Sequence, residues 1–70
     1  MKNGIRIRYR FALGTMEQPD STWFSGKVEA GDTGVYLGVH PNRKLKGWLL
    51  TRADSGAYVP VTKNQIEIAA

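Results

Sequence analysis

The sequence contains no cysteine among its 70 residues. This absence excludes disulfide bonds, thiolate chemistry and cysteine-rich zinc sites, and a secreted protein of this length usually needs such cross-links. We therefore expect a reducing, cytoplasmic setting. The sequence also lacks an apolar run long enough to span a bilayer, so no contact with a membrane is expected.

Residue types that commonly form catalytic or metal sites are scarce. His40 is the only histidine, and no serine stands in a recognisable nucleophile motif. The carboxylates lie mostly in predicted turns, and neither a P-loop nor a dinucleotide-binding fingerprint is present. We therefore predict that the protein is not an enzyme, has no catalytic residue, metal ligand or cofactor, and uses His40 to cap a loop.

The composition is that of one globular domain spanning residues 1–70. Hydrophobic residues make up 41% of the chain and charged residues 23%, which suits a soluble fold with a single core. A domain this short buries a limited share of its surface, so its stability could depend on a partner or on self-association into a homo-oligomer. The formal charge of +4 favours contact with phosphates or acidic protein surfaces.

Strict alternation marks residues 4–13 as the clearest strand. Its apolar residues are predicted to face the core, and Arg6, Arg8 and Arg10 to face solvent. Residues 14–22 read as a long polar loop because they include Pro19-Asp20-Ser21. Further short strands are predicted around 23–29, 35–39, 48–52, 57–59 and 66–68, with Pro60 at a strand end or edge. These elements predict an all-β fold.

The segment GWLLTRADSGAYVPVTKNQIEI resembles the end of a Src-homology-3 domain in layout. A Gly-Trp opens a strand, and a tight hairpin, an aliphatic-Pro pair, a helical turn and a closing strand follow. RFALGTMEQPD resembles the first strand and long loop of that family. KVEAGDTGVYLG resembles its diverging turn and is also similar to the KOW motif of ribosome- and transcription-associated proteins. The resemblance implies an SH3-like barrel of five to six strands with a short helical turn before the last strand.

Trp48 and Pro60 match positions that form grooves for proline-rich ligands in peptide-binding members of the Src-homology-3 family. The layout therefore predicts that these two side chains lie close together. Residues 12–14 match only the start of the family's tyrosine-containing segment, so the resemblance bears on the fold more than on peptide recognition.

Two groups of basic residues are candidate phosphate-binding sites. Arg6, Arg8 and Arg10, here called the arginine face, are expected to lie about 7 Å apart along one strand, a spacing able to follow a nucleic acid backbone. A second group, here called the basic loop, consists of Arg43, Lys44 and Lys46 at a predicted hairpin tip. Each group could equally be a solvated surface, but the two together on one face would favour nucleic acid.

The aromatic residues outnumber what so small a core can easily hide, so one or two should be partly exposed. Trp23, Trp48 and Tyr58 are the candidates for stacking on bases or for contacting a protein. The leading hypothesis is a non-enzymatic module that binds nucleic acid or another phosphate-bearing ligand through the basic residues. The alternatives are a protein–protein interaction module, for example a phage-type inhibitor that docks through Trp48, Tyr58 and residues 14–22, and a structural domain of an assembly.

Overall fold

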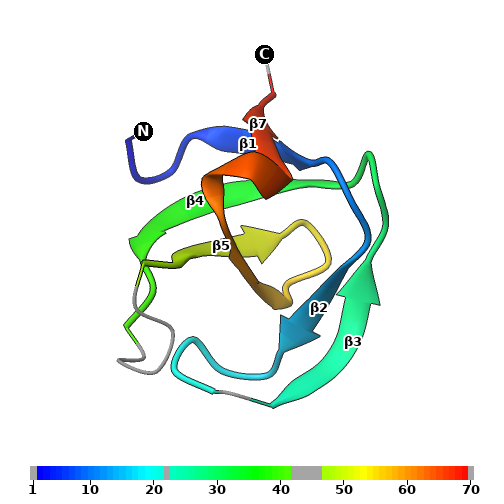
Figure 1. Cartoon of the computed structure of the whole chain (residues 1–70), viewed down its shortest axis with the longest axis vertical. Helices are drawn as coiled ribbons and strands as arrows, with labels where there is room; N and C mark the ends of the chain where they lie inside the picture. The colour runs from blue at the N-terminus through cyan, green and yellow to red at the C-terminus, as the bar shows by residue number, and fades with distance from the viewer. Residues whose placement is uncertain (1, 22, 42–46, 70) are drawn as a thin grey trace.

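Seven β-strands form one antiparallel sheet in the computed structural model, which describes residues 2–21, 23–41 and 47–69 (Figure 1). A 3-10 turn, η2, immediately precedes the last strand. In chain order the elements are β1 (Arg6–Tyr9), β2 (Leu13–Met16), β3 (Phe24–Val28), β4 (Thr33–Val39), β5 (Leu49–Ala53), β6 (Tyr58–Val61), η2 (Lys63–Gln65) and β7 (Ile66–Ile68). The all-β prediction is confirmed, and so is the short helical turn.

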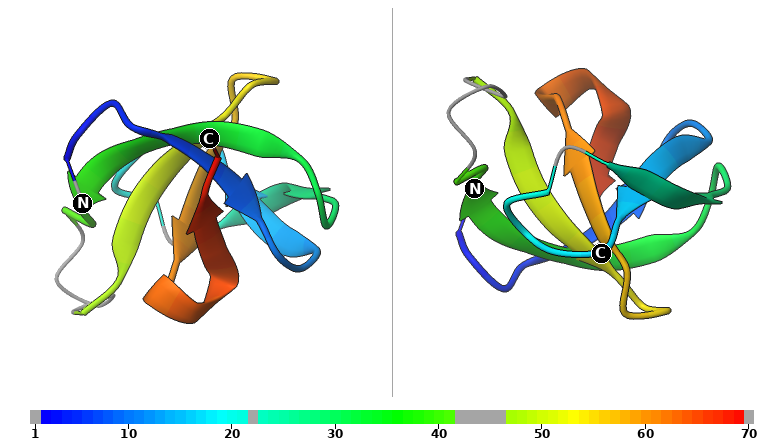
Figure 2. Two further views of the ribbon diagram at one scale, coloured as in Figure 1. Left: turned by 90° about the horizontal axis from the view of Figure 1, so that it is seen from above. Right: turned by 90° about the horizontal axis from the view of Figure 1, so that it is seen from below.

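The strands lie side by side in the order β3-β2-β6-β5-β4-β1-β7, and the sheet is strongly curved (Figure 2). Its end strands, β3 and β7, are not paired with each other, so the sheet is not closed into a barrel. The expected number of five to six strands was too low. The extra strand arises because the segment predicted as one long first strand forms two.

The predicted strand over residues 4–13 is interrupted after Tyr9. The pairing of β1 with β4 ends at Arg8–Thr33, and its pairing with β7 ends at Tyr9–Ile66. Beyond this point the chain bends, because the next ladder is made with β3 and β6 instead. Phe11 lies in the bend and is 51% exposed, so its predicted position on the core face was wrong.

The predicted polar loop over residues 14–22 begins three residues too early. Gly14, Thr15 and Met16 belong to β2, and Thr15 and Met16 are buried. Thr15 pairs with Gly26 across the β2–β3 hairpin. A glycine and a threonine carry little hydrophobic signal, so the alternation that identified β1 could not identify this strand.

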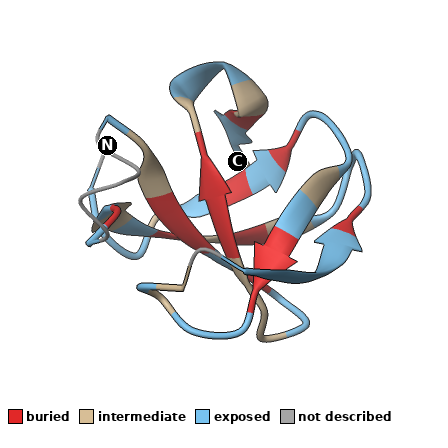
Figure 3. Cartoon of the chain, turned by 60° about the horizontal axis from the view of Figure 1, so that its bottom comes forward, coloured by how far each residue is buried: buried red, intermediate tan, exposed pale blue. Residues whose placement is uncertain are grey.

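The main core lies on the concave face of the sheet and draws on most of the strands, as the distribution of buried positions shows (Figure 3). Its buried members are Ile7, Tyr9, Val28, Tyr36, Ala53, Val59, Val61 and Ile66. A smaller cluster lies on the opposite face. There the register pairs Met16 with Tyr58 and Leu50 with Pro60. Met16, Leu50 and Pro60 are all buried, so the outer side of the central strands is also apolar.

A chain of two hydrogen bonds crosses the core. The Thr51 hydroxyl donates to the Val59 carbonyl at 2.9 Å, which leaves the Tyr9 hydroxyl to donate to Thr51 Oγ1 at 2.8 Å. Burial raises the pKa of Tyr9, as expected for a phenol removed from water.

Replacing Tyr9 by phenylalanine should lower the free energy of unfolding by about 1 kcal/mol, because Thr51 Oγ1 loses its donor in a site closed to water. Urea unfolding measures this loss. Tyr58→Phe is the control, since Tyr58 is only half-buried, and we expect a change below about 0.5 kcal/mol. Equal losses in the two variants would show that the buried hydrogen bond contributes nothing.

Candidate functional site

The arginine face starts at Arg6, whose guanidinium binds both oxygens of one carboxylate. Arg6 Nη1 donates to Asp54 Oδ1 at 2.7 Å and Nη2 donates to Asp54 Oδ2 at 2.8 Å. Thr33 Oγ1 accepts a further bond from Arg6 at 3.2 Å and itself donates to Asp54 Oδ2. Arg6 therefore already has the bidentate partner that a phosphate would have to replace.

These hydrogen bonds make the Asp54 carboxyl more acidic than an ordinary aspartate. Donation from Arg6 and then from Thr33 lowers the pKa of Asp54 from 3.8 to about 2. A depressed pKa adds stability that is complete above the unfolded-state pKa and is lost as the pH falls through the folded-state pKa. The Asp54 contribution should therefore disappear between about pH 4 and pH 2.

Asp54→Asn should lower the melting temperature at neutral pH and leave it close to wild type near pH 2. Thermal unfolding at the two pH values measures this convergence. Glu67→Gln is the matched carboxylate control and should have the smaller effect, because Glu67 makes a single, longer contact to an arginine. A gap between wild type and Asp54→Asn that persists at pH 2 would contradict the ion-pair account.

The other two residues of the arginine face are also in contact with the protein. Arg8 Nη1 lies 3.6 Å from Glu67 Oε1. Arg10 Nη1 donates to the Asn64 carbonyl at 3.3 Å, and its guanidinium carbon lies 5.8 Å from the centre of the Phe11 ring. Two of the three arginines thus face carboxylates. Phosphate binding by this face stays a prediction, and the basic loop (Arg43, Lys44 and Lys46) lies outside the described residues.

Trp48 and Tyr58 are half-buried; Trp48 directly precedes β5, and Tyr58 begins β6. The Trp48 carbonyl accepts a hydrogen bond from the His40 amide at 2.9 Å, which continues the β4–β5 ladder past its last paired residues. Leu50 pairs with Pro60 two residues further along, so Trp48 and Pro60 are diagonal neighbours on one sheet face. Tyr58 lies under Arg52, whose guanidinium carbon is 5.8 Å from the ring centre.

His40 is buried at the end of β4 and belongs to the smaller apolar cluster. Its Nε2 lies 3.4 Å from Met16 Sδ. Burial lowers the pKa of His40, and the nearby Asp20 carboxylate partly offsets this effect. Among the described residues, no group of three or more His, Cys, Asp and Glu side chains could hold a metal ion. These contacts give His40 a packing role.

A shallow cleft of about 350 Å³ lies between the β4 start and the β5–β6 turn. Its lining residues are Gly31, Asp32, Thr33, Ala53, Asp54 and Ser55. Both carboxylates already have partners: Asp54 binds Arg6 and Thr33, and Asp32 Oδ2 accepts a hydrogen bond from the Glu29 amide at 2.9 Å. The cleft therefore offers a ligand few free polar groups.

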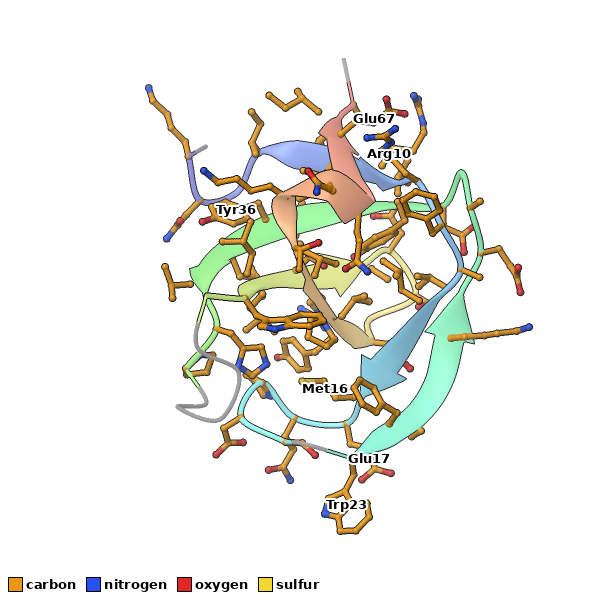
Figure 4. All side chains as sticks on the ribbon, viewed as in Figure 1. Arg10, Met16, Glu17, Trp23, Tyr36 and Glu67 are labelled. Atoms are coloured by element: carbon orange, nitrogen blue, oxygen red, sulfur yellow. The ribbon has the colours of Figure 1, made fainter. Side chains whose placement is uncertain are left out.

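The most exposed aromatic side chains stand at the start of β3. Trp23 is 81% exposed and Phe24 is 60% exposed. We call these two residues the aromatic edge. With Phe11, three aromatic side chains are exposed, one more than the expected one or two. Trp23 points away from the body of the protein (Figure 4).

Both residues of the aromatic edge make local contacts. The Trp23 amide donates to Ser21 Oγ at 3.0 Å. The Phe24 ring lies over Gly14 on the neighbouring strand, where an added Cβ would stand 2.9 Å from Phe24 Cδ1. Phe24 was not predicted as a site residue. The available signal was that two consecutive aromatic residues in a strand cannot both face the core.

The segment of sequence that carries the aromatic edge is acidic, although the protein as a whole is basic. Residues 13–29 contain three carboxylates, Glu17, Asp20 and Glu29, and a single basic residue, Lys27, whereas the rest of the chain has nine basic and three acidic residues. Lys27 Nζ lies 3.3 Å from Glu29 Oε1. Glu17 directly follows Met16, and Trp23 directly precedes its pairing partner Phe24, so both residues lie at the same end of the β2–β3 pair, where Figure 4 labels them.

Comparison with known proteins gives no relative for this arrangement. No protein-family model matches the chain, and no curated protein or solved structure matches it either. Among the described residues, the structure contains no helix of the length and apolarity needed to cross a membrane.

Proposed function

We propose that this chain is a non-enzymatic protein-binding module that contacts its partner through the aromatic edge. The main supporting observation is that Trp23 is 81% exposed and Phe24 is 60% exposed. The two residues are adjacent, at the start of the end strand β3. Exposed tryptophan and phenylalanine side chains are enriched at protein interfaces, where they bury a large area at a low cost in conformational entropy. A single exposed aromatic residue is common, but two adjacent ones at the start of an end strand offer a partner apolar contacts on both sides of that edge.

Two residues of the arginine face already contact carboxylates of the protein, which also supports this proposal. Both terminal nitrogens of Arg6 donate hydrogen bonds to the Asp54 carboxylate, and Arg8 faces Glu67. A phosphate group would have to displace these contacts, whereas a partner at the aromatic edge displaces only water.

For the fold, we propose an SH3-like arrangement that remains open between β3 and β7. In support, β1 is followed by a long excursion that contains the β2–β3 hairpin, and β4, β5 and β6 then form a meander. The 3-10 turn η2 leads into β7, which pairs with β1. On this layout the aromatic edge lies in the long connection after the first strand, a kind of segment that commonly carries binding residues.

Nucleic acid is the second candidate ligand, favoured by the net charge of +4 and by Arg10, whose guanidinium contacts a carbonyl and a ring rather than a carboxylate. The net negative charge of residues 13–29, which carry the aromatic edge, argues against base stacking there, because it would repel the phosphates that accompany each base.

Tryptophan fluorescence can distinguish the two ligands. In a Trp48→Phe variant, Trp23 is the only tryptophan, and its exposed indole should be readily quenched by iodide. Peptides selected from a random displayed library against the wild-type protein should shift the Trp23 emission to the blue and protect it from iodide, because binding removes the indole from water. We expect single- and double-stranded oligonucleotides to leave this signal unchanged.

The Trp23→Phe variant, which reports from Trp48 alone, is the control and should respond weakly to the same peptides. If selected peptides changed only the Trp48 signal, the proposed surface would be wrong. Oligonucleotide binding that weakens as salt rises over roughly 50 to 200 mM, and that is lost on replacing Arg6, Arg8 and Arg10 by alanine, would establish the second candidate instead.

A further inference from the structure

The strand that carries Phe24 is the last strand on its side of the sheet. Within the described parts of the chain, β3 pairs with β2 alone. Backbone N–H and C=O groups along the other edge are therefore open to solvent. An open edge is a template for one further strand, because main-chain groups can pair with any extended segment.

β3 has some of the features that normally limit strand addition but lacks others. The strand has five residues and no proline, and its one charged residue, Lys27, is paired with Glu29. The register with β2 shifts between Thr15 and Met16, which leaves Ser25 without a partner as a bulge. The bulge limits the regular edge to residues 26–28. An added strand here would be short and would need side-chain contacts to hold it.

The aromatic edge supplies such contacts on both faces. Successive strand residues point to opposite faces, so Phe24 lies on one face and Trp23 on the other. On the Phe24 face, the ring covering Gly14 offers an apolar surface. On the Trp23 face, the exposed indole attracts a cation, and Glu17 at the same end of the β2–β3 pair adds a negative charge that favours one there.

A second copy of this chain does not match these requirements. Antiparallel pairing of two β3 edges would bring together two hairpins that each carry three carboxylates and one lysine. Like charges in close contact oppose association.

We propose that the partner adds to β3 as an extended strand in which lysine or arginine alternates with apolar residues. Period-two alternation places every apolar side chain on the Phe24 face and every cation on the Trp23 face. This inference rests on the proposed function, because it uses the same aromatic edge, and it adds the conformation and the charge of the bound segment.

The probe is a short synthetic peptide that alternates lysine with valine, titrated into the full chain at low salt. It should bind, and its affinity should fall as salt rises, because the cation–carboxylate contacts are exposed. Two control peptides should bind at least about tenfold more weakly. One replaces every lysine by glutamate, and the other keeps the composition but groups the lysines in a block.

Single N-methylation along the lysine–valine peptide tests the main-chain pairing. In an added strand, alternate N–H groups face β3, so methylation should abolish binding at every second position and be tolerated in between. Among protein variants, Trp23→Ala should weaken binding about tenfold and Glu17→Gln severalfold. Val39→Ala should have no effect, since Val39 is a 74% exposed apolar residue on β4, away from β3.

The outcomes separate the two proposals. No binding of the lysine–valine peptide, equal binding of the glutamate peptide, or methylation effects without period two would overturn strand addition. If the methylation effects lacked period two but binding still required Trp23 and Phe24, the aromatic edge would remain the binding surface and only strand addition would be rejected. Binding indifferent to Trp23→Ala and to Phe24→Ala would overturn both. Sedimentation that detects a dimer lost on replacing Phe24 would identify a second copy as the occupant instead.

Discussion

Replacing Gly34 by alanine should remove about 3 kcal/mol of stability, the largest effect of any single methyl group added to this protein. Gly34 pairs with Ile7 on one side and with Ala53 on the other, at the centre of the β1–β4–β5 ladder. A Cβ at this position would meet the Arg52 carbonyl oxygen, with Tyr9 Oη at 2.8 Å and the Ala53 Cα at 3.0 Å.

The cost is high because the obstructing atoms are mostly backbone in paired strands, which cannot move without breaking the ladder. Any shift of Tyr9 would also disturb its hydrogen bond to Thr51. A chain of this length has a total stability of about 4–10 kcal/mol, so much of it would be lost. Urea unfolding of wild type and variant measures the difference.

Gly14→Ala is the matched control for Gly34→Ala. Its Cβ would also approach a neighbour at 2.9 Å, but that neighbour is the ring of Phe24, a largely exposed side chain that can turn away. We expect a loss below about 1 kcal/mol. Similar losses of stability in the two variants would mean that β4 and β5 are not closely packed around Gly34.

The double variant Trp23→Ala, Phe24→Ala should lower partner affinity about a hundredfold and leave the folded state almost unchanged. The affinity loss follows from removing the two largest exposed aromatic side chains, since a few such residues carry most of the binding energy of an interface. The free energy of unfolding should change by less than about 0.5 kcal/mol per residue, because neither side chain belongs to a buried cluster.

Both properties must be measured on the same protein, using the peptides selected against wild type and urea unfolding. Val39→Ala serves as the control for removing exposed apolar surface. A large loss of stability in the double variant would assign Trp23 and Phe24 a structural role. Unchanged affinity would exclude them from the interface.

The all-β class was predictable because it depends on local alternation and on turn residues. β1 and β7 each carry apolar residues at every second position, and the turns around Gly31 and Gly56 follow directly from the sequence. β2 was not predictable in this way. Thr15 of β2 is buried where it pairs with Gly26. This contact joins two segments of the chain, so no local sequence pattern predicts it.

The candidate site was predictable only in part. Trp23 was selected for its residue type, and its neighbour Phe24 could have been selected because adjacent strand residues face opposite ways. The three side chains of the arginine face were expected to point into solvent and to be free to bind phosphate. Its partners Asp54 and Glu67 are 48 and 59 residues away from Arg6 and Arg8 in sequence, so only the folded sheet brings them together. Charge pairing across a sheet requires the strand order, which composition does not supply.

Backbone amide chemical shifts, followed by NMR during titration, test the central claim most directly. A selected peptide and a single-stranded oligonucleotide should be titrated separately into the full chain. The aromatic edge as binding surface predicts that the peptide produces the largest shifts at Glu17 and from Trp23 to Val28, with little change at Arg6, Arg8 and Arg10. Peptide shifts centred on those three arginines, or larger shifts with the oligonucleotide than with the peptide, would contradict it.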